Sequence, residues 1–364
     1  MRVLGIESSC DETAAAVVEI DEQTKVCRLL SNVVVSQIDI HKAYGGVVPE
    51  IAARSHIEAI MPVIDEALKT AVLAKDDIDA IAVTYGAGLG GSLLVGVITA
   101  RSLSLALNKP LYAINHVEAH VYANFITQTA PALSSNFQLP SSAPKFPILA
   151  LIVSGGHTQL VLFKDHFDYQ ILGKTQDDAI GEAFDKVAKM TGLPYPGGPS
   201  VAAKAKDGDP YKFNFPKANV DGDFNFSFSG LKTAVLRTAQ GLTGHNHTLP
   251  STELPGLLSE AQKADIAASF QRTAIETVVD KTVAAYEQYS PTSVIIAGGV
   301  ASSDELRRQL SEKLPIKVEY TDRKLCTDNA AMIATLGCFK AILKSEPADP
   351  YTLEIQPSLK MLAV

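Results

Sequence analysis

Two histidines four residues apart are the most chemically suggestive pair in this 364-residue chain. In the run from His116 to His120, a helix would project both imidazoles from one face, which is the geometry that captures a transition metal. In a metalloprotease motif, a glutamate directly follows the first histidine and activates a metal-bound water. Glu118 instead comes two positions after His116, about 200° around a helix, and points away. The spacing favours a metal site other than a protease, with two surface histidines as the alternative.

A third ligand for such a metal could come from Asp328, which precedes the apolar stretch Ala330–Met332. The carboxylate could simply cap a helix or favour its dipole. If it faces the two imidazoles instead, the three side chains form a His₂Asp set with open positions. Such a set suits Fe²⁺, Zn²⁺ or Mn²⁺ and leaves room for substrate oxygens.

Glycine-rich turns after apolar runs are the second sign of chemistry. Ser154–Gly156 and Gly298-Gly299 each follow such a run, and Gly86–Gly91 holds four glycines. Backbone N–H groups in these turns can bind a phosphate, and Ser302 or Ser303 could cap a following helix. Plain turns are the alternative at each place. The Walker A pattern is missing, which argues against that nucleotide-binding fold.

Strands and helices must position these groups. Val3–Glu7 and Ile148–Val153 each read as a strand followed by a turn and a second strand, which predicts two hairpins of one design and an internal duplication. Apolar residues at a 3.6-residue period predict helices at 49–69, 93–107, 117–125, 261–289 and 304–314. Buried strands are predicted at 78–84 and 293–297. Strands that alternate with helices indicate an α/β class with mixed sheets.

Composition and charge narrow the functional class. A hydrophobic fraction of 46% and a charged fraction of 20% indicate a globular protein, and the length predicts two domains. With 32 basic and 40 acidic residues, the net charge of −8 argues against a stand-alone nucleic-acid binder. An RNA substrate would need a partner or a local basic patch. The stretch 183–240 offers a modest one, although a solvated surface is the more common explanation: Lys186, Lys189, Lys204, Lys206, Lys212, Lys217, Lys232 and Arg237.

Cysteine usage and apolar runs bear on the compartment. The four cysteines form no C-x-x-C pair, which indicates reduced thiols. We expect no apolar run of the roughly 18–20 residues that a membrane span needs, and no signal peptide is readable. These features predict a cytoplasmic protein without a membrane partner. The polar segment 240–256 reads as an exposed insertion, so we expect His245 and His247 to lie on the surface and not in a metal site.

Several motifs taken together closely resemble the TsaD family, the catalytic subunit of tRNA threonylcarbamoyladenosine synthesis. These motifs run from Gly5 to about Gly337 and are Gly5–Thr13, Tyr44–Glu50, His116-x-x-x-His120, Ser154–Gln159, Phe228–Thr233 and Thr327–Ala330. The stretches Asp177–Lys186 and Tyr195–Pro199 resemble the bacterial and organellar branch. The resemblance implies a two-lobed actin/Hsp70/sugar-kinase-like (ASKHA) fold with a duplicated RNase H-like domain.

The resemblance also implies a domain organisation. It places an N-terminal lobe at 1–125, which a C-terminal helix near 328–345 would complete. A loop or linker is expected at 126–147. The second lobe is expected at 148–327, with a helical insertion near 175–260.

The implied activity is transfer of a threonylcarbamoyl group from threonylcarbamoyl-AMP to N6 of adenosine 37 in tRNAs that read ANN codons, forming t6A and releasing AMP. His116, His120 and Asp328 match the metal ligands of the family, with Fe²⁺ expected and Zn²⁺ as the alternative. Asp11 and Glu12 match acidic residues of the first loop, in a catalytic or a structural role. The positions that match adenylate-binding residues are Ile152, Val153, Ser154, Gly155, Gly156, Asp185, Gly198 and Ser303. The chain departs from the usual family residues at Ala87, Ala202 and Ser303.

Partners and rival functions follow from the same resemblance. Bacterial relatives are expected to act with TsaB-like and TsaE-like subunits, and the organellar kind as a homodimer. One rival function is a small-molecule kinase of the same superfamily, but Mg²⁺ sites prefer carboxylates and water to two histidines. The other is a non-catalytic assembly subunit, which would be expected to lose the histidines and Asp328.

Overall fold

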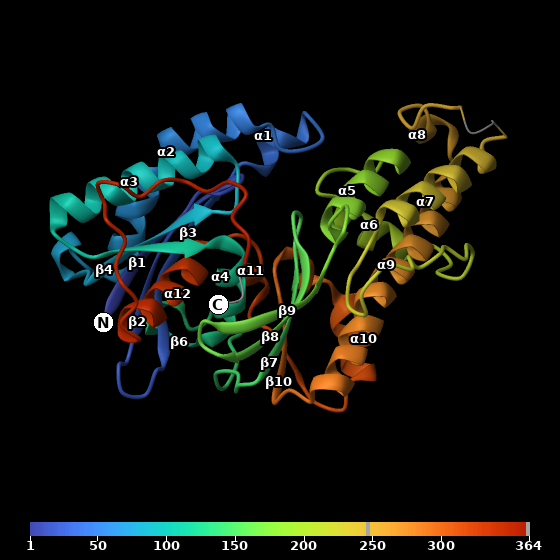
Figure 1. Cartoon of the computed structure of the whole chain (residues 1–364). Coiled ribbons are helices and arrows are strands. Elements are labelled where there is room, and N and C mark those ends of the chain that lie inside the picture. Colours follow the sequence, from blue (N-terminus) through green and yellow to red (C-terminus); the bar gives the residue numbers. More distant parts are fainter. Residues whose placement is uncertain (245–247, 362–364) are drawn as a thin grey trace. The chain divides into compact units, whose positions relative to one another are not determined.

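The computed structural model describes residues 1–244 and 248–361, and the chain divides into two compact units (Figure 1). The first unit comprises Met1–Lys145 and Glu319–Val364, and the second comprises Phe146–Val318. His245 and His247 lie outside the described residues. The predicted α/β class with mixed sheets is confirmed. One sheet is built from strands within residues 2–129 and the other from strands within residues 148–319.

The first sheet has the strand order β5-β4-β1-β2-β3-β6. β1 (Arg2–Glu7) pairs antiparallel with β2 (Glu12–Ile20), which pairs antiparallel with β3 (Cys27–Ser36). On its other side β1 pairs in parallel with β4 (Ala80–Gly86), and β4 pairs with β5 (Leu111–Asn115). The carboxyl ends of β1, β4 and β5 therefore lie at one edge of the sheet.

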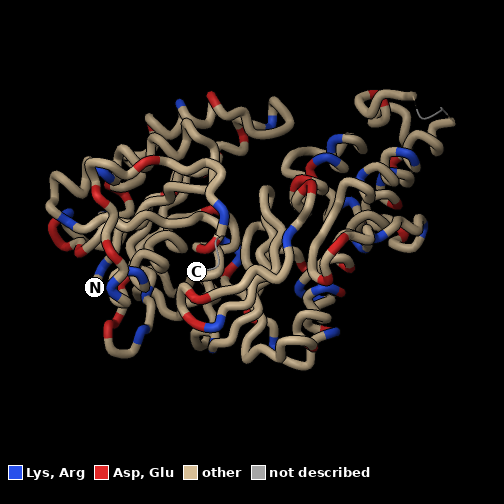
Figure 2. The backbone as a smooth tube through the Cα atoms, in the orientation of Figure 1, with Lys and Arg blue, Asp and Glu red and all other residues tan. Residues whose placement is uncertain are grey.

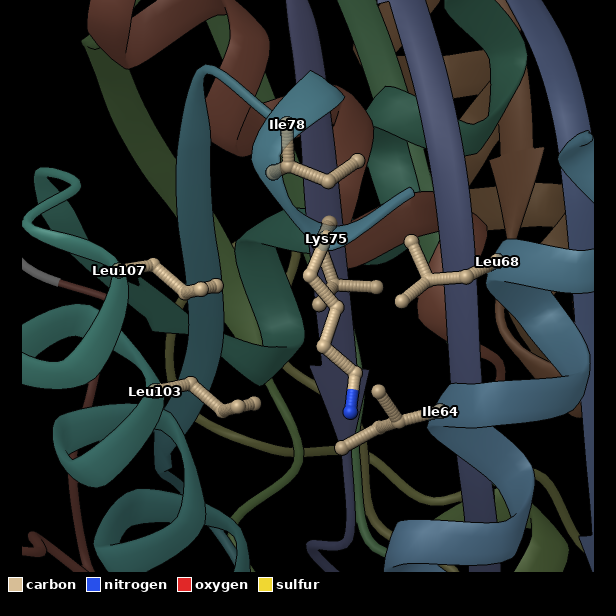
Figure 3. Close-up of a pocket in the computed structure, with 7 residues that line it drawn as sticks. Ile64, Leu68, Lys75, Ile78, Leu103 and Leu107 are labelled. Atoms are coloured by element: carbon tan, nitrogen blue, oxygen red, sulfur yellow. The ribbon is translucent and has the colours of Figure 1, made fainter. Parts of the chain in front are cut away.

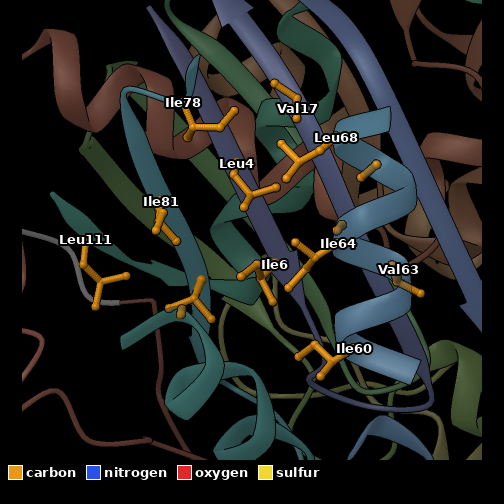
Figure 4. Close-up of a cluster of buried hydrophobic side chains, with 14 of the residues drawn as sticks. Leu4, Ile6, Val17, Ile60, Val63, Ile64, Leu68, Ile78, Ile81 and Leu111 are labelled. Carbon is orange, nitrogen blue, oxygen red and sulfur yellow. The ribbon is translucent and has the colours of Figure 1, made fainter. Parts of the chain in front are cut away.

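Side chains of β1 alternate between two helical layers, as the period of a strand requires. Leu4 and Ile6 join an apolar core with residues of α2 (Pro49–Ala71) and α3 (Gly90–Leu107) (Figure 4). Gly5 faces the opposite layer, where α12 (Ala330–Ile342) approaches so closely that a side chain at this position would meet its backbone. Helix α12 contacts all five strands from β1 to β5.

The second sheet repeats the arrangement of the first. Its order is β11-β10-β7-β8-β9, so a three-stranded antiparallel meander again carries a parallel neighbour beside its first strand. The predicted duplication is thus present in the topology. The strands are β7 (Ile148–Val153), β8 (Thr158–Asp165), β9 (Asp168–Lys174), β10 (Ser293–Ala297) and β11 (Val318–Glu319).

The helices predicted from periodicity are confirmed. Besides α2 and α3 they are α4 (His116–Tyr122), α9 (Glu260–Tyr289) and α10 (Asp304–Lys313). In the region expected as a helical insertion, the second unit adds α5 (Ile180–Thr191), α6 (Gly197–Ala205), α7 (Ser229–Leu242) and the short α8 (Leu254–Leu257). The remaining short helices are α1 (Ile38–Lys42) and α11 (Arg323–Cys326).

The segment expected as a linker at 126–147 belongs, up to Lys145, to the first unit. It begins with β6 (Ile126–Thr129), which pairs in parallel with β3. Further along, the backbone N–H of Gln138 donates to the Asp322 carboxylate at 2.8 Å. Side-chain and backbone bonds thus hold this stretch against its own unit, although its many small and polar residues suggested a loop.

Helix α3 is, among the described helices, the one long and apolar enough by composition to cross a membrane. The expectation that no segment would reach this length and apolarity is therefore wrong. A third of the helix is buried, where it packs on β4 and α2 as the core helix of a folded unit does.

A small apolar pocket lies at the opposite edge of the first sheet from the carboxyl ends of its parallel strands (Figure 3). Its walls come from α2, α3 and the start of β1, and Lys75 reaches across it toward an ion pair with Asp65. The lining residues are Leu4, Ile64, Leu68, Lys75, Ile78, Leu103 and Leu107. We assign no ligand to this pocket.

Candidate metal centre and glycine-rich turns

Three predicted ligands meet at the carboxyl-end edge of the first sheet. His116 and His120 lie on α4, which follows β5 directly, and Asp328 lies between α11 and α12. Nε2 of His116 is 3.5 Å and Nε2 of His120 is 3.4 Å from the same oxygen, Oδ1 of Asp328. The ligand atoms of all three residues lie within 4.8 Å of one another. The structure therefore brings the three side chains together as the spacing and the resemblance predicted.

The donor set fits a divalent cation. His120 is 2% exposed, and neither of its ring nitrogens has a hydrogen-bond partner in the part of the chain that the structure describes. Buried polar atoms without partners are rare in folded proteins, because their desolvation is not compensated. A cation bound by both Nε2 atoms and Asp328 Oδ1 would supply the missing partner, and two imidazoles with one carboxylate suit Fe²⁺ or Zn²⁺.

Two asparagines fix where the ligand-bearing helices begin. Oδ1 of Asn115 accepts from the N–H groups of Val117 and Glu118 at 2.9 and 3.3 Å, so α4 starts at His116. Oδ1 of Asn329 accepts from Met332 N–H at 3.2 Å and caps α12. The alternative in which Asp328 caps this helix is therefore wrong. The cap belongs to the next residue, which leaves the Asp328 carboxylate facing the imidazoles.

Glu7 and Ser9 hold the first histidine from behind. Nδ1 of His116 lies 3.1 Å from Oε2 of Glu7 and 3.1 Å from Oγ of Ser9. Thr84 in turn donates its hydroxyl to the same Glu7 oxygen at 2.7 Å. A carboxylate behind a metal-binding imidazole fixes its tautomer and ring orientation. Neither residue was predicted as part of the site, although a glutamate at the end of the apolar strand Val3–Ile6 was a usable signal.

The charged groups around the metal ligands shift one another's pKa values. Burial by itself would raise the pKa of Asp328, but His116 and His120 outweigh it and hold that pKa well below its usual range. Burial would likewise lower the pKa of His116, but Asp328 and Glu7 hold it well above its usual value. In the metal-free protein His116 is thus an imidazolium between two carboxylates. A bound cation must displace that proton.

Comparison with known proteins decides the family. Residues 28–335 match the TsaD family, described as tRNA N6-adenosine threonylcarbamoyltransferase. The chain belongs to this family. It is 48% identical over 340 residues to the tRNA N6-adenosine threonylcarbamoyltransferase of Symbiobacterium thermophilum, across 93% of this chain and 91% of that protein. It is 47% identical over 365 residues to the protein of the same name from Thermosipho africanus, across 99% and 100%.

Solved structures agree on the fold. Full-length HypF, in its phosphate- and nucleotide-bound form, aligns with a TM-score of 0.55 at 12% identity, over 94% of this chain and 47% of HypF. This likeness shows the fold alone. Together with the repeated strand order of the two sheets, it bears out the predicted two-unit ASKHA architecture of a TsaD chain.

The first loop carries the two acids matched to the TsaD family. Asp11 is 7% exposed, and its carboxyl group is hydrogen-bonded to that of Glu12. Burial, then the nearby carboxylates of Asp328 and Asp11, raise the pKa of Glu12 to about 9. His56 anchors the loop from α2, because its Nε2 lies 3.0 Å from the Cys10 carbonyl oxygen, which can only accept. The loop therefore places two carboxyl groups side by side, and the pKa of one of them, Glu12, is raised.

In the second unit, the turn after β7 offers backbone groups to a ligand. Ile152 and Val153 are fully buried within the strand, so their side chains are not available to substrate. Gly155, Gly156 and Gly198 have open space where a side chain would lie. Open glycines leave backbone N–H groups accessible to an anion, which is the property expected of phosphate-binding turns in this TsaD chain.

Neighbouring glycines let two elements pack directly beneath that turn. A side chain at Gly181, in the first turn of α5, would meet the Ser154 carbonyl oxygen. Gly298 has φ +90° and would meet the Val153 carbonyl oxygen in the same way. The turns that follow β7 and β10 and the start of α5 are therefore gathered at one place in the unit.

The last two predicted adenylate positions have local partners. Oδ1 of Asp185 accepts from Gly197 N–H at 2.6 Å and so holds the start of α6 beside α5. Ser303 is the N-cap of α10, with Oγ 3.4 Å from Leu306 N. Capping is thus one role of Ser303 in this TsaD chain, and its hydroxyl hydrogen remains available to donate.

The glycines at 86–91 serve close packing. A side chain at Gly86 would meet the carbonyl oxygen of Gln356, and one at Gly88 would meet the carbonyl oxygen of Ser9. Leu89 N–H donates to that same Ser9 oxygen at 2.7 Å. These contacts account for glycine at positions 86 and 88 without a bound phosphate.

Four of the eight basic residues in the modest patch at 183–240 are paired with acids. Figure 2 shows Lys and Arg interleaved with Asp and Glu over the helices of the second unit. Lys186 and Lys232 both pair with Asp178, while Lys204 pairs with Glu260. Lys217 pairs with Glu276 and Asp280. The interpretation of this stretch as a solvated, charge-balanced surface is therefore the better one for these four lysines.

Proposed function

We propose that this protein transfers a threonylcarbamoyl group from threonylcarbamoyl-AMP to N6 of adenosine 37 in tRNAs that read ANN codons, forming t6A and releasing AMP. Membership of the TsaD family across nearly the full chain supports this activity. The observation that carries the proposal is the convergence of His116, His120 and Asp328 on one point. A sugar-kinase-like enzyme has no use for such a set, since its Mg²⁺ prefers oxygen ligands.

The reaction sets the demands on the protein. The donor is a mixed anhydride of a carbamate and AMP, so its carbonyl carbon is already activated. The N6 lone pair attacks that carbon, a C–N bond forms, the bond to the phosphate oxygen breaks, AMP leaves, and N6 loses a proton. N6 is a poor nucleophile because its lone pair is delocalised into the ring. Catalysis must therefore come from positioning and from stabilising charge on the departing phosphate.

The metal in the proposal is Fe²⁺, with Zn²⁺ as the alternative. His116, His120 and Asp328 would hold the ion, and Glu7 would keep the His116 ring in place through Nδ1. When bound, such a cation supplies Lewis acidity toward a phosphate or carbamoyl oxygen. A His₂-carboxylate set that leaves other coordination positions open is the ligand pattern of non-haem Fe²⁺ sites.

Asp11 is the base in this proposal. Glu12, whose pKa is raised to about 9, keeps its proton at neutral pH beside Asp11. Asp11 can then accept the proton lost by N6, a role that is typically worth about 10² to 10⁴ in rate. In the second unit, the N–H groups of Gly155 and Gly156 would hold the phosphate of AMP as charge develops on it.

Partner subunits are the next part of the proposal. The net charge of −8 and the pairing of four lysines of the patch with acids weaken the attraction for tRNA, which supports dependence on TsaB-like and TsaE-like subunits. Helices α2 and α3 pack side by side in the first unit (Figure 1). Each exposes two apolar side chains one turn apart, which are Ile57 and Met61 on α2 and Leu94 and Ile98 on α3. We assign this face to a TsaB-like subunit, with a second copy of this chain as the alternative.

The free cysteines support a reducing compartment, the cytoplasm.

The test of the activity uses purified protein, unmodified tRNA and synthetic threonylcarbamoyl-AMP. The nucleosides are then released and weighed by mass spectrometry, with and without TsaB-like and TsaE-like subunits. We expect t6A in the complete mixture and none with Asp328→Asn. Phosphorylation of a sugar or acid without t6A would instead support the kinase. Light scattering measures the mass of the complex with a TsaB-like subunit. Loss of that complex in the variant Ile57→Lys, which changes the exposed face of α2, would support the assigned partner face.

A further inference from the structure

The segment 346–361, which we call the C-terminal strap, lies along the first unit as the red trace beside α3 and β4 in Figure 1. Ala348 N–H donates to the Leu111 carbonyl at 2.7 Å and starts the strap beside β5. The guanidinium of Arg101 then donates to three strap carbonyls, those of Pro350, Tyr351 and Leu353, at 2.6, 2.6 and 3.3 Å. A chain segment without helix or strand is thus fixed through its own backbone.

The strap next contacts the glycine turn that supports the metal centre. Gln356 N–H donates to the Tyr85 carbonyl at 2.7 Å, and Gly88 N–H donates to the Pro357 carbonyl at 3.1 Å. The other side of Gly88 packs on the backbone of Ser9. The hydroxyl of Ser9 reaches Nδ1 of His116 at 3.1 Å. One layer of backbone therefore separates the strap from a residue that touches the ligand.

The far end of the strap is tied to the start of the metal helix by a single amide. Nδ2 of Asn115 donates to the Lys360 carbonyl at 3.2 Å, while Oδ1 of the same side chain caps α4. Met361, the last described residue, is 2% exposed and anchors this end in the core. His116 follows Asn115 directly, so both faces of this amide act next to the ligand.

We propose that the C-terminal strap positions His116 for metal binding, through Asn115 on one side and through the Gly88–Ser9 contact on the other. The inference rests on the proposed metal site. The observation behind it is that two separate routes from the strap end at the same imidazole. A cover that only shields apolar surface would have no reason to bond to the amide that sets the first residue of α4.

The decisive variant is Asn115→Ser. A serine hydroxyl still accepts from the N–H groups at the start of α4 and so keeps the cap, but its oxygen lies one bond short of the position of Nδ2 and does not reach the Lys360 carbonyl. Arg101→Ala releases the strap at a place remote from the ligands. Arg308→Ala is the matched control, because this arginine also makes several side-chain bonds, to Glu305 and Glu312, but on the second unit.

The measurement is the affinity of each metal-stripped protein for Co²⁺, by competition with a chelator, together with the visible absorption of bound Co²⁺ and the urea midpoint of unfolding. We expect about tenfold weaker binding and an altered Co²⁺ spectrum in Asn115→Ser and Arg101→Ala, with Arg308→Ala like wild type. If Arg101→Ala unfolds, Asn115→Ser alone decides.

The outcomes separate two failures. Wild-type protein that binds no Co²⁺ would overturn the proposed metal site, and the positioning role with it. Wild-type binding with unchanged affinity and spectrum in Asn115→Ser would overturn the strap inference and leave the metal site standing. A lower urea midpoint without any change in Co²⁺ affinity would also count against it, since that is the result expected of a purely structural segment.

Discussion

Oε2 of Glu7 lies 3.1 Å from Nδ1 of His116, on the opposite side of the imidazole from Nε2, which faces Asp328. Glu7 is fully buried at the end of β1, and Thr84 holds its carboxylate by a further hydrogen bond. This carboxylate–imidazole pair is what a metal centre needs to keep one ring nitrogen directed at the ion.

Replacing Glu7 by Gln is therefore expected to weaken metal binding about 10- to 100-fold, because His116 loses the charge that fixes its tautomer. Chelator competition with Zn²⁺ measures the change. Glu118→Gln is the matched control, since this glutamate is likewise buried and its charged neighbour is Lys340 of α12 and not a metal ligand. Equal affinities in the Glu7→Gln variant and wild type would show that Glu7 does not support the site.

Metal binding should release protons. The pKa of His116 is held well above its usual value, so the imidazole carries a proton that a cation must displace. Affinity is then expected to fall as the pH is lowered. Titration calorimetry in two buffers of different ionisation enthalpy gives the number released, which we expect to be about one near neutral pH. No buffer dependence would contradict the imidazolium.

Glu118 should make stability depend on pH. Burial, only partly offset by Lys340, raises its pKa to about 7 from 4.5. The folded state therefore binds the proton more tightly, and stability falls as the pH rises from about 4.5 through 7. Replacing Glu118 by Gln removes this loss, so the variant should gain about 2–3 kcal/mol relative to wild type between pH 5 and pH 8. Urea unfolding at the two pH values measures it, and parallel curves would argue against the raised pKa.

Substitutions of the two acids of the first loop should lower the rate of t6A formation to different extents. Glu12→Gln mimics a carboxyl group that is already protonated, so single-turnover t6A formation should fall less than tenfold, whereas Asp11→Asn should lose about 10² to 10⁴. Circular dichroism checks folding in both. The reverse order would assign the base to Glu12, and two unaffected variants would leave the pair a structural role.

Two adjacent glycines offer a matched test of the turn after β10. Gly298 has φ +90° and no room beside the Val153 carbonyl, whereas Gly299 has open space. Gly298→Ala should destabilise the second unit by about 1–3 kcal/mol, because this backbone region is essentially restricted to glycine. Gly299→Ala should unfold like wild type. Thermal unfolding of the two variants decides, and equal midpoints would contradict the packing described here.

Periodicity and apolar runs were enough to predict the main helices and the two hairpins. The apolar run Ile148–Val153 predicted both ends of β7 correctly, because an uninterrupted apolar run bounded by turns has few other interpretations. β6 was missed, since its pairing with β3 depends on a distant strand. That α3 is long and apolar enough to cross a membrane was not predicted either, because a 3.6-residue period indicates a helix and not how apolar it is in total.

The metal ligands could be predicted from the sequence, whereas the residues that hold those ligands in position could not. His116 and His120 are linked by spacing, and Asp328 was a candidate from its place before an apolar stretch, which the family motif then matched. Glu7 comes from a strand more than a hundred residues away, and only the pairing of β1 with β4 brings it behind the His116 ring. The strap contact of Asn115 likewise depends on tertiary structure alone.

We infer that t6A formation requires one cation held by His116, His120 and Asp328. The most direct test measures t6A by mass spectrometry after reaction of metal-stripped protein, the same protein reloaded with Fe²⁺, and an Asp328→Asn variant treated identically, each with its TsaB-like and TsaE-like partners. We predict t6A from the reloaded wild type alone. Full t6A formation by the stripped protein, or by reloaded Asp328→Asn, would contradict the account.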